Sequence, residues 1–383
     1  MSTAADGGRP LRIWEACSGP QLNGAVVHFK LVAEGLAARG HVVTAVVRPG
    51  SWAAAQEWDP RVRLLECRMD RWPPSAPWAE ARRARAEQVD VVHSHMTRAD
   101  NHGLAMRLLA GVPSVATAHA HTVHPHWRLH DHVIAVSETT RSFHLARNRV
   151  RPSRISTVFG MIPIENYDRI DPVERRALRS HFGAADSDLV IGMLAHIHPR
   201  KGPDLLIEAL PRVLERLGPS VRVVFAGEGS PEYVGGLEAR ARALGVADRI
   251  AFVGIRTDVA RTVDAYDLLC LPSRQEAFSV AILESMAMRR PFVATLVGGS
   301  GEFVPPDGPA GRLIPPENVE ALADALVDVA SLPAEERAAM GARGRRFVDG
   351  NFTVESQIPR IEAVLRRVVS GGRGHGSHAT DHP

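Results

Sequence analysis

Two glutamates and a run of backbone amides in the second half of the sequence have the spacing of a site for a phosphorylated, hydroxyl-rich ligand. Glu276 and Glu284 are separated by seven residues, in a stretch 271–287 that changes from apolar strand to loop to helix. Free N–H groups near Ser279 and Val280, at the start of that helix, would attract a phosphate because the helix dipole is positive there. Carboxylates accept hydrogen bonds from sugar hydroxyls. The alternative is a loop acid and a surface helix acid without a ligand.

Histidines crowd a second stretch, 119–132, which follows a strand expected at 114–118. His119 comes directly after that strand and is a candidate for contact with a ligand. The other candidates could ligate zinc, since imidazole is a common zinc ligand, and they are His121, His124, His126 and His130. Their spacings lie in an expected mobile loop without a cysteine partner. The sequence therefore predicts no metal site.

The elements that must position these residues alternate along the chain. Short runs rich in Val and Ile are followed by longer amphipathic stretches, which is typical of parallel sheets with crossover helices. The pattern occurs twice. Strands are expected at 12–16, 41–47, 62–67, 90–95, 114–118 and 132–136, and again at 189–194, 221–226, 250–253, 268–271 and 291–295. The clearest helices are expected at 25–39, 204–217, 231–244 and 280–288.

Length and pattern together predict an α/β protein with two Rossmann-like, doubly wound domains facing each other across a cleft. At 383 residues the chain exceeds one ordinary core. The predicted organisation is a first domain at 1–168, a second domain at 169–350, a helix at 351–370 and a disordered tail at 371–383. A polar segment at 165–188 is interpreted as the hinge region. Ligands bind outside the carboxyl ends of such strands, so function is expected in those loops.

Composition narrows the classes of function. The apolar share of 45% and the charged share of 23% are ordinary for a globular protein. A formal net charge of +3 is small for this length, so no nucleic-acid partner is expected. Three separated cysteines, Cys17, Cys67 and Cys270, fit no CxxC pair and indicate a reducing compartment. No run of about 18 apolar residues occurs, and we expect a cytoplasmic protein.

One basic run qualifies that expectation. The stretch 141–154 contains five arginines and no acid, and they are Arg141, Arg147, Arg149, Arg151 and Arg154. Such a run would suit anionic lipid at the inner face of the membrane, as a peripheral contact, or an acidic acceptor. The alternative is a solvated helix face and its loop.

The ordered set of motifs resembles glycosyltransferase family 4 over nearly the whole chain. The paired glutamates of 271–287 look like the signature of that family, and eight further segments fall where the family places its motifs: 23–25, 36–41, 132–137, 201–210, 226–229, 252–254, 298–302 and 307–308. Any one match is weak, whereas the ordered set is specific. The resemblance implies the GT-B architecture and a retaining transfer from a UDP- or GDP-sugar to a hydroxyl acceptor, in cell-envelope glycan or glycoconjugate synthesis. It implies that the domain at 1–168 is the acceptor-side domain, that the domain at 169–350 binds the nucleotide sugar, and that the helix at 351–370 returns to the first domain. It implies no cofactor beyond this co-substrate and no metal.

The resemblance also implies roles for individual residues. The catalytic set would be His119 at the donor sugar, Lys201 at the leaving phosphate and Glu276 at the transferred sugar. Glu284 would bind the ribose. Backbone contacts to the donor would come from Gly24, Gly227, Gly254, Phe278, Ser279 and Val280. No protein nucleophile would be needed, because the departing phosphate would accept the proton of the acceptor.

The sequence departs from the family pattern at His196, where the family usually has an arginine five residues before the lysine. Three outcomes stay open: His196 binds phosphate in protonated form, Arg200 replaces it, or activity is weakened. Two other functions also stay open, namely a GT-B sugar-nucleotide epimerase and a non-catalytic nucleotide-binding homologue. A nicotinamide-dependent dehydrogenase is disfavoured because no GxGxxG motif opens either domain. The donor sugar, base, acceptor, linkage and oligomeric state are not readable from the sequence.

Overall fold

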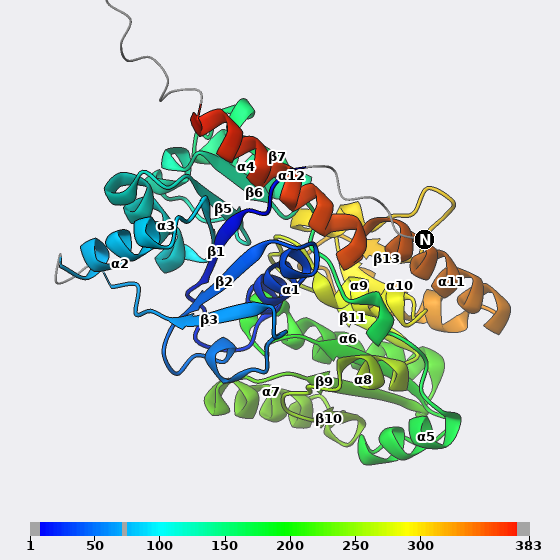
Figure 1. Cartoon of the computed structure of the whole chain (residues 1–383). Coiled ribbons are helices and arrows are strands. Elements are labelled where there is room, and N and C mark those ends of the chain that lie inside the picture. Colours follow the sequence, from blue (N-terminus) through cyan, green and yellow to red (C-terminus); the bar gives the residue numbers. More distant parts are fainter. Residues whose placement is uncertain (1–7, 71–74, 374–383) are drawn as a thin grey trace, which may run out of the picture. The chain divides into compact units, whose positions relative to one another are not determined.

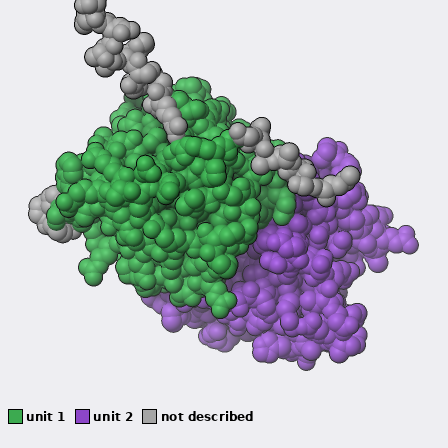
Figure 2. All heavy atoms as spheres, viewed as in Figure 1, with its two compact units in different colours: residues 1–161, 354–383 green, residues 162–353 purple. Residues whose placement is uncertain are grey.

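The computed structural model describes residues 8–70 and 75–373, and these divide into two α/β units (Figures 1 and 2). Unit 1 contains the chain up to Met161 and resumes at Val354, whereas unit 2 contains Ile162–Thr353. The sequence analysis placed these boundaries at 168 and 350. From residue 374 onward, the tail predicted at 371–383 lies outside the described residues.

Unit 1 is built on a seven-stranded parallel sheet in the order β3-β2-β1-β4-β5-β6-β7. Its strands are β1 (Arg12–Cys17), β2 (Val42–Val47), β3 (Val62–Glu66), β4 (Val91–His95), β5 (Ser114–Ala118), β6 (His132–Ala135) and β7 (Ile155–Thr157). Its α-helices are α1 (Gly24–Ala38), α2 (Ser75–Ala86), α3 (Thr97–Ala110), α4 (Glu138–Arg147) and α12 (Val354–Arg373). The strand order reverses between β1 and β4, which is the switch point of a doubly wound sheet.

The two faces of this sheet pack against different helices, because successive side chains of a strand point to opposite faces. On one face, Ile13 and Cys17 of β1 share a core with α1 and α12. On the other face, Trp14 and Ala16 of the same strand share a core with α2 and α3. The position of Glu15, between Trp14 and Ala16 in sequence, therefore places it on the α1 face. It is a buried charge there, with 0% exposure.

Unit 2 repeats the doubly wound plan with a six-stranded parallel sheet in the order β10-β9-β8-β11-β12-β13. Its strands are β8 (Leu189–Leu194), β9 (Val221–Ala226), β10 (Ile250–Phe252), β11 (Leu268–Leu271), β12 (Phe292–Thr295) and β13 (Gly311–Ile314). Its α-helices are α5 (Pro172–His181), α6 (Pro203–Leu217), α7 (Pro231–Ala243), α8 (Val259–Ala265), α9 (Val280–Ala287), α10 (Val319–Ser331) and α11 (Ala334–Asn351). Its switch point lies between β8 and β11. The predicted α/β class with two Rossmann-like domains is confirmed.

Three features differ from the sequence-based expectations or were missed by them. The edge strands β7 and β13 were not predicted, because their sequences, Ile155-Ser-Thr157 and Gly311-Arg-Leu-Ile314, contain no run of three apolar residues. The segment interpreted as a hinge contains helix α5, and the guanidinium of Arg179 on that helix is buried and bonded to Asp267 at 3.0 Å. That interpretation was therefore wrong for the residues of α5.

Within the described ranges, no helix is both long enough and apolar enough to cross a membrane.

Candidate functional site

The switch point of unit 2 brings two of the predicted loops together. The loop after β8 carries Lys201 at the end of a short 3-10 turn, η5 (Pro199–Lys201), and the loop after β11 carries Glu276. Gly202 lets these loops touch: its φ is +71°, and a Cβ there would lie 2.1 Å from the carbonyl oxygen of Pro272. The turn and the strand end are thus held in direct backbone contact.

Lys201 and Glu276 form an ion pair in this site. Nζ of Lys201 donates to Oε1 of Glu276 at 2.6 Å, and the hydroxyl of Ser273 donates to the same oxygen at 2.7 Å. The lysine side chain is 16% exposed and the glutamate side chain 4% exposed. Two residues predicted to contact the leaving phosphate and the transferred sugar therefore lie against each other, with the carboxylate almost fully buried.

Glu284, the second predicted glutamate, lies on α9 and has a different partner. The phenol of Tyr167 donates to its Oε1 at 3.0 Å. Burial raises the pKa of Glu284 to about 7, and the Tyr167 hydrogen bond acts in the opposite direction. The sequence analysis missed Tyr167, because it lies 117 residues away in the chain and no motif marks it.

The start of α9 is the segment that was predicted to bind an anion. Ser279 is the N-cap residue, yet its side chain makes no capping hydrogen bond to the helix. No acidic residue occupies the first turn. Phe278 packs its ring against Phe303, with centroids 5.0 Å apart, which fixes the chain direction into Ser279 and Val280. The first amides of the helix are therefore neither capped by Ser279 nor faced by an acid from their own turn.

Three further predicted residues meet at the carboxyl edge of β8, β9 and β10. The N–H of Gly227 donates to the carbonyl of Gly254 at 2.8 Å. Gly227 has a φ of +151°, and a Cβ there would lie 1.8 Å from the carbonyl oxygen of Ala195. His196, which follows Ala195, is exposed, and its ring stacks on that of His198 with centroids 5.9 Å apart. The glycine is required for this approach of three loops.

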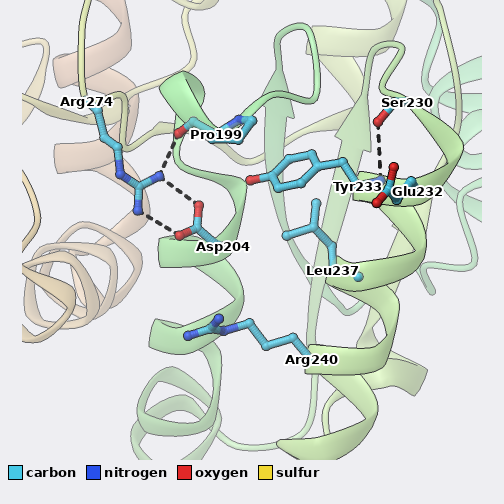
Figure 3. Close-up of a pocket in the computed structure, with 9 residues that line it drawn as sticks. Pro199, Asp204, Ser230, Glu232, Tyr233, Leu237, Arg240 and Arg274 are labelled. Atoms are coloured by element: carbon cyan, nitrogen blue, oxygen red, sulfur yellow. Dashed lines mark hydrogen bonds and ion pairs between the residues drawn. The ribbon is translucent and has the colours of Figure 1, made fainter.

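Arg274 braces the turn that carries Lys201, as Figure 3 shows. Its guanidinium donates to the carbonyl of Pro199 at 2.6 Å and to both carboxylate oxygens of Asp204 at 2.9 and 2.7 Å. Its backbone N–H donates to the carbonyl of Arg200 at 2.8 Å. The sequence analysis did not single out Arg274. The Arg274 side chain thus ties the β11 loop to the start of η5 and to the first turn of α6.

An open cavity of about 470 Å³ lies beside this brace. It is lined by Pro199, Asp204, Ser230, Glu232, Tyr233, Gly236, Leu237, Arg240 and Arg274, and Figure 3 shows the Tyr233 ring directed across it toward Asp204. None of the predicted site residues is among its lining. The cavity therefore adjoins the Lys201 turn without containing the predicted donor contacts.

The remaining predicted residues, Gly24 and His119, belong to unit 1. Gly24 is exposed and begins helix α1, where the side chain of Asn23 caps the N–H groups of Ala25 and Val26 at 3.0 and 3.2 Å. His119 follows β5 and is partly buried. Both residues thus lie at carboxyl ends of strands or in the loops that follow them, where ligands bind in such sheets.

His119 belongs to a polar cluster that the sequence analysis missed. Its Nε2 lies 2.9 Å from Nδ1 of His95, and Nε2 of His95 lies 2.6 Å from Oε1 of Glu15. His93, on the same strand as His95, also contacts Glu15. Burial and the nearby His93 lower the pKa of His119 to about 3. The polar sequence His93-Ser94-His95, ending a strand, was the available signal.

Two groups of side chains in the described part of the chain could hold a metal ion. They are His28, His95 and His119, and Glu15, His93 and His95. Neither group includes His121, His124, His126 or His130, the candidate zinc ligands of the sequence analysis. The zinc ligands considered there therefore do not converge with each other, and the clustered histidines lie deeper in unit 1.

Two family models match this chain. The model described as "Glycosyltransferase Family 4" matches residues 22–166, and the model described as "Glycosyl transferases group 1" matches residues 188–331. The matches fall in unit 1 and unit 2 respectively.

The chain is also similar to curated glycosyltransferases. A D-inositol 3-phosphate glycosyltransferase of Mycobacterium marinum is 28% identical over 306 residues, covering 73% of this chain and 64% of the relative. One of Actinosynnema mirum is 31% identical over 280 residues, covering 66% of each chain. The matched region therefore spans less than two thirds of the length of these relatives.

Solved structures share the fold. Anabaena Alr3699/HepE in complex with UDP and glucose superimposes with a TM-score of 0.82 at 21% identity, covering 93% of this chain and 99% of that one. A glycosyltransferase from Rickettsia africae gives a TM-score of 0.83 at 17% identity, covering 94% and 99%. These likenesses establish the GT-B fold with its two Rossmann-like domains.

Proposed function

Because this chain belongs to glycosyltransferase family 4, we propose that it transfers a sugar from a nucleoside diphosphate sugar to a hydroxyl acceptor, with retention of anomeric configuration. The observation that carries the proposal is the Lys201–Glu276 pair at the switch point of unit 2. This pair is a cation and a carboxylate in one site, close in sequence to the start of α9, which the Ser279 side chain does not cap. A cation and free helix amides are the groups that stabilise a departing diphosphate.

The arrangement supports a division of labour within unit 2. Lys201 would leave Glu276 for the diphosphate, whose charge attracts the ammonium group more strongly than one carboxylate does. Glu276 would then accept hydrogen bonds from the transferred sugar while Ser273 continues to orient it. Glu284 would accept hydrogen bonds from the ribose, with Tyr167 holding one of its oxygens. The departing phosphate would take the proton of the acceptor, so positioning and electrostatic stabilisation are the tasks of the protein.

The donor and the setting are also proposals. Complexes of a structural neighbour with UDP and with UDP-glucose support a nucleotide-sugar donor, of which UDP- and GDP-sugars are the candidates. The acceptor would be a hydroxyl compound of cell-envelope glycan or glycoconjugate synthesis. We place the enzyme in the cytoplasm, with a peripheral contact to anionic membrane through the exposed arginines of α4 and the residues after it.

A thermal-shift panel followed by product analysis tests the proposal. UDP, GDP, ADP and dTDP, each with and without an attached sugar, are compared, since a ligand that binds the native state raises its melting temperature. One nucleotide and its sugar are expected to raise the melting temperature, and the sugar to be transferred to an alcohol acceptor. Interconversion of the donor sugar without an acceptor would instead identify an epimerase. Binding with neither transfer nor donor hydrolysis would identify a non-catalytic homologue.

A further inference from the structure

A buried chain of hydrogen bonds leads from Glu15 to His119, the histidine predicted to contact the donor sugar. Glu15 and His95 have 0% exposure, and the two contacts along the chain measure 2.6 and 2.9 Å. The strands that carry them are neighbours in the sheet, in the order β1-β4-β5. All three side chains lie on the α1 face, where Phe29 of α1 packs its ring 5.7 Å from that of His95. The chain is thus sealed by helix α1.

The proton positions in this chain follow from its contacts when Glu15 is ionised. An ionised carboxylate only accepts hydrogen bonds, so Nε2 of His95 must carry a proton toward Glu15. A neutral imidazole then has a lone pair on its other nitrogen, and Nδ1 of His95 accepts from Nε2–H of His119. The remaining nitrogen of His119, Nδ1, is left as an acceptor. A sugar hydroxyl would donate to it.

A second branch supports the ionised form of Glu15. Nδ1 of His93 lies 2.9 Å from Oε1 and 3.1 Å from Oε2 of Glu15, and Nε2 of His93 lies 2.7 Å from the hydroxyl of Thr117. When the hydroxyl donates to Nε2, the proton of His93 lies on Nδ1, facing Glu15. In that arrangement the carboxylate receives two N–H donors. Oε1 of Glu15 lies within 3 Å of a ring nitrogen of both His93 and His95. A protonated carboxyl could donate its single proton to only one of these rings, whereas an ionised carboxylate accepts from both.

His28 is the third member of the possible metal group with His95 and His119, and the contacts of this group favour a hydrogen bond over a metal ion. His28 lies edge-on to His119 with ring centroids 5.0 Å apart, and neither of its ring nitrogens has a hydrogen-bond partner. The 2.9 Å between His95 and His119 is a hydrogen-bond distance. Two nitrogens bound to one tetrahedral zinc, each at about 2.0–2.1 Å, would lie about 3.3 Å apart. The separation therefore fits a shared proton better than a shared metal ion.

We propose that Glu15 and His95 are positioning residues that fix the proton of His119 on Nε2, so that Nδ1 accepts a hydrogen bond from a hydroxyl of the donor sugar. The inference rests on the proposed function for the role of His119. The assignment of the His119 proton to Nε2 does not rest on the proposed function, because it follows from contacts within unit 1. Neither Glu15 nor His95 is assigned any role by the motifs of the sequence.

The first test reads the proton directly in the full chain. Long-range ¹H–¹⁵N correlation spectra of protein labelled with ¹⁵N-histidine distinguish the two neutral tautomers, and the His119→Asn variant assigns the signal. We expect His119 protonated on Nε2 in the unmodified protein. In Glu15→Gln, the amide N–H can donate to Nε2 of His95, which puts the His95 proton on Nδ1. His95 would then donate to Nε2 of His119, so the signal of His119 protonated on Nδ1 should appear. A wild-type His119 protonated on Nδ1 would overturn the proposal, as would one stoichiometric equivalent of zinc in the purified protein.

The second test asks whether the chain matters for transfer. Glu15→Gln should lower kcat at least tenfold while the Kd for free nucleotide, which is assigned to unit 2, changes less than twofold. The matched control is Glu362→Gln, because Glu362 also contacts a histidine in unit 1, with 3.1 Å between its Oε1 and Nε2 of His41. That variant should leave kcat and the His119 tautomer unchanged. Equal kcat losses in both variants, or an unchanged kcat in Glu15→Gln, would refute the positioning role. If no transfer is detected at all, the proposed function fails while the tautomer measurement still judges Glu15.

Discussion

Nζ of Lys201 lies 2.6 Å from Oε1 of Glu276, although the two residues come from different loops of unit 2 and were predicted to bind different parts of a donor. The pair is partly buried, and its carboxylate has one further described donor, the hydroxyl of Ser273. The two side chains therefore stabilise each other in the ligand-free protein. Donor binding would exchange this contact for contacts with phosphate and sugar.

Lys201→Ala should lower the free energy of unfolding by about 1–3 kcal/mol, because it leaves a buried carboxylate short of a partner. The double variant Lys201→Ala with Glu276→Ala should lose less than the sum of the two single variants. Urea denaturation measures all three. Arg200→Ala, at the exposed neighbour of Lys201, is the control and should change stability by less than about 0.5 kcal/mol. Strictly additive losses would show that the ion pair contributes no coupling.

Nucleotide affinity should depend on the protonation of Glu284. Burial raises its pKa to about 7, and the ribose is expected to bind the ionised form. Affinity should therefore fall as pH drops below about 7, by up to roughly tenfold per unit. Calorimetric titration of the nucleotide between pH 5.5 and 8.5 measures this. Glu284→Gln should bind more weakly at pH 8 with a flatter profile, and Glu276→Ala should leave free-nucleotide affinity nearly unchanged. Equal losses in both variants would contradict the assignment of the ribose to Glu284.

The same group should make the ligand-free protein less stable at high pH. A carboxyl whose folded pKa is raised contributes stability that is fully present below its unfolded pKa of about 4.3 and lost as pH rises through about 7. Ligand-free Glu284→Gln should therefore unfold at a higher temperature than wild type at pH 8. Tyr167→Phe removes the hydrogen bond that lowers this pKa, so the midpoint of the affinity profile should move upward. Identical pH profiles of nucleotide affinity for wild type and Tyr167→Phe would show that the Tyr167 hydrogen bond does not affect the pKa of Glu284.

His196→Arg should hold or improve nucleotide affinity near neutral pH. His196 is exposed beside the loops of Gly227 and Gly254, and a guanidinium is charged at all relevant pH values, whereas an imidazole is charged only on the acid side. Calorimetric titration in the Glu284→Gln background measures this, because that background removes the pH dependence assigned to Glu284. His196→Ala should bind the nucleotide more weakly than its parent there. If His196→Ala binds the nucleotide as tightly as its parent, Arg200 becomes the preferred phosphate ligand.

Arg274→Gln should loosen the turn that carries Lys201. Loss of the bonds to Pro199 and Asp204 should increase amide hydrogen exchange in 199–202 and lower kcat/KM for the donor about tenfold. The matched control is Arg240→Gln, which lines the same cavity and pairs with Glu208 rather than with the turn. Unchanged exchange at 199–202 in Arg274→Gln would show that the turn is held by other contacts.

Replacing Arg147, Arg149 and Arg151 by alanine should weaken binding to anionic vesicles. These three side chains are exposed, whereas Arg141 lies 3.6 Å from Glu138. Attraction of about 1 kcal/mol per well-placed arginine should be lost and should fade in wild type as salt is raised. Co-sedimentation at low and high salt measures the effect. Absence of wild-type binding at low salt would assign the run to a solvated surface.

The sequence by itself determined the secondary structure of most strands and the place of the nucleotide-side motifs. Strand periodicity and local motifs are short-range signals, so 268–271 and the start of α9 could be recognised without knowing their neighbours. The ordered motifs also indicated the family, which the matches to both units confirm. The edge strand β7 was missed because Ile155-Ser-Thr157 contains only one large apolar residue.

Only the tertiary structure decided which side chains meet. Glu15 and His95 are 80 residues apart, and Tyr167 and Glu284 are 117 apart. The strand order, in which β4 lies beside β1, determines the first pair, and packing within unit 2 determines the second. Burial then changes the chemistry of each group, raising the pKa of both carboxyls and lowering that of His119. Residue types and spacing carry no information about these pairings, because a single sequence does not state which strands become neighbours.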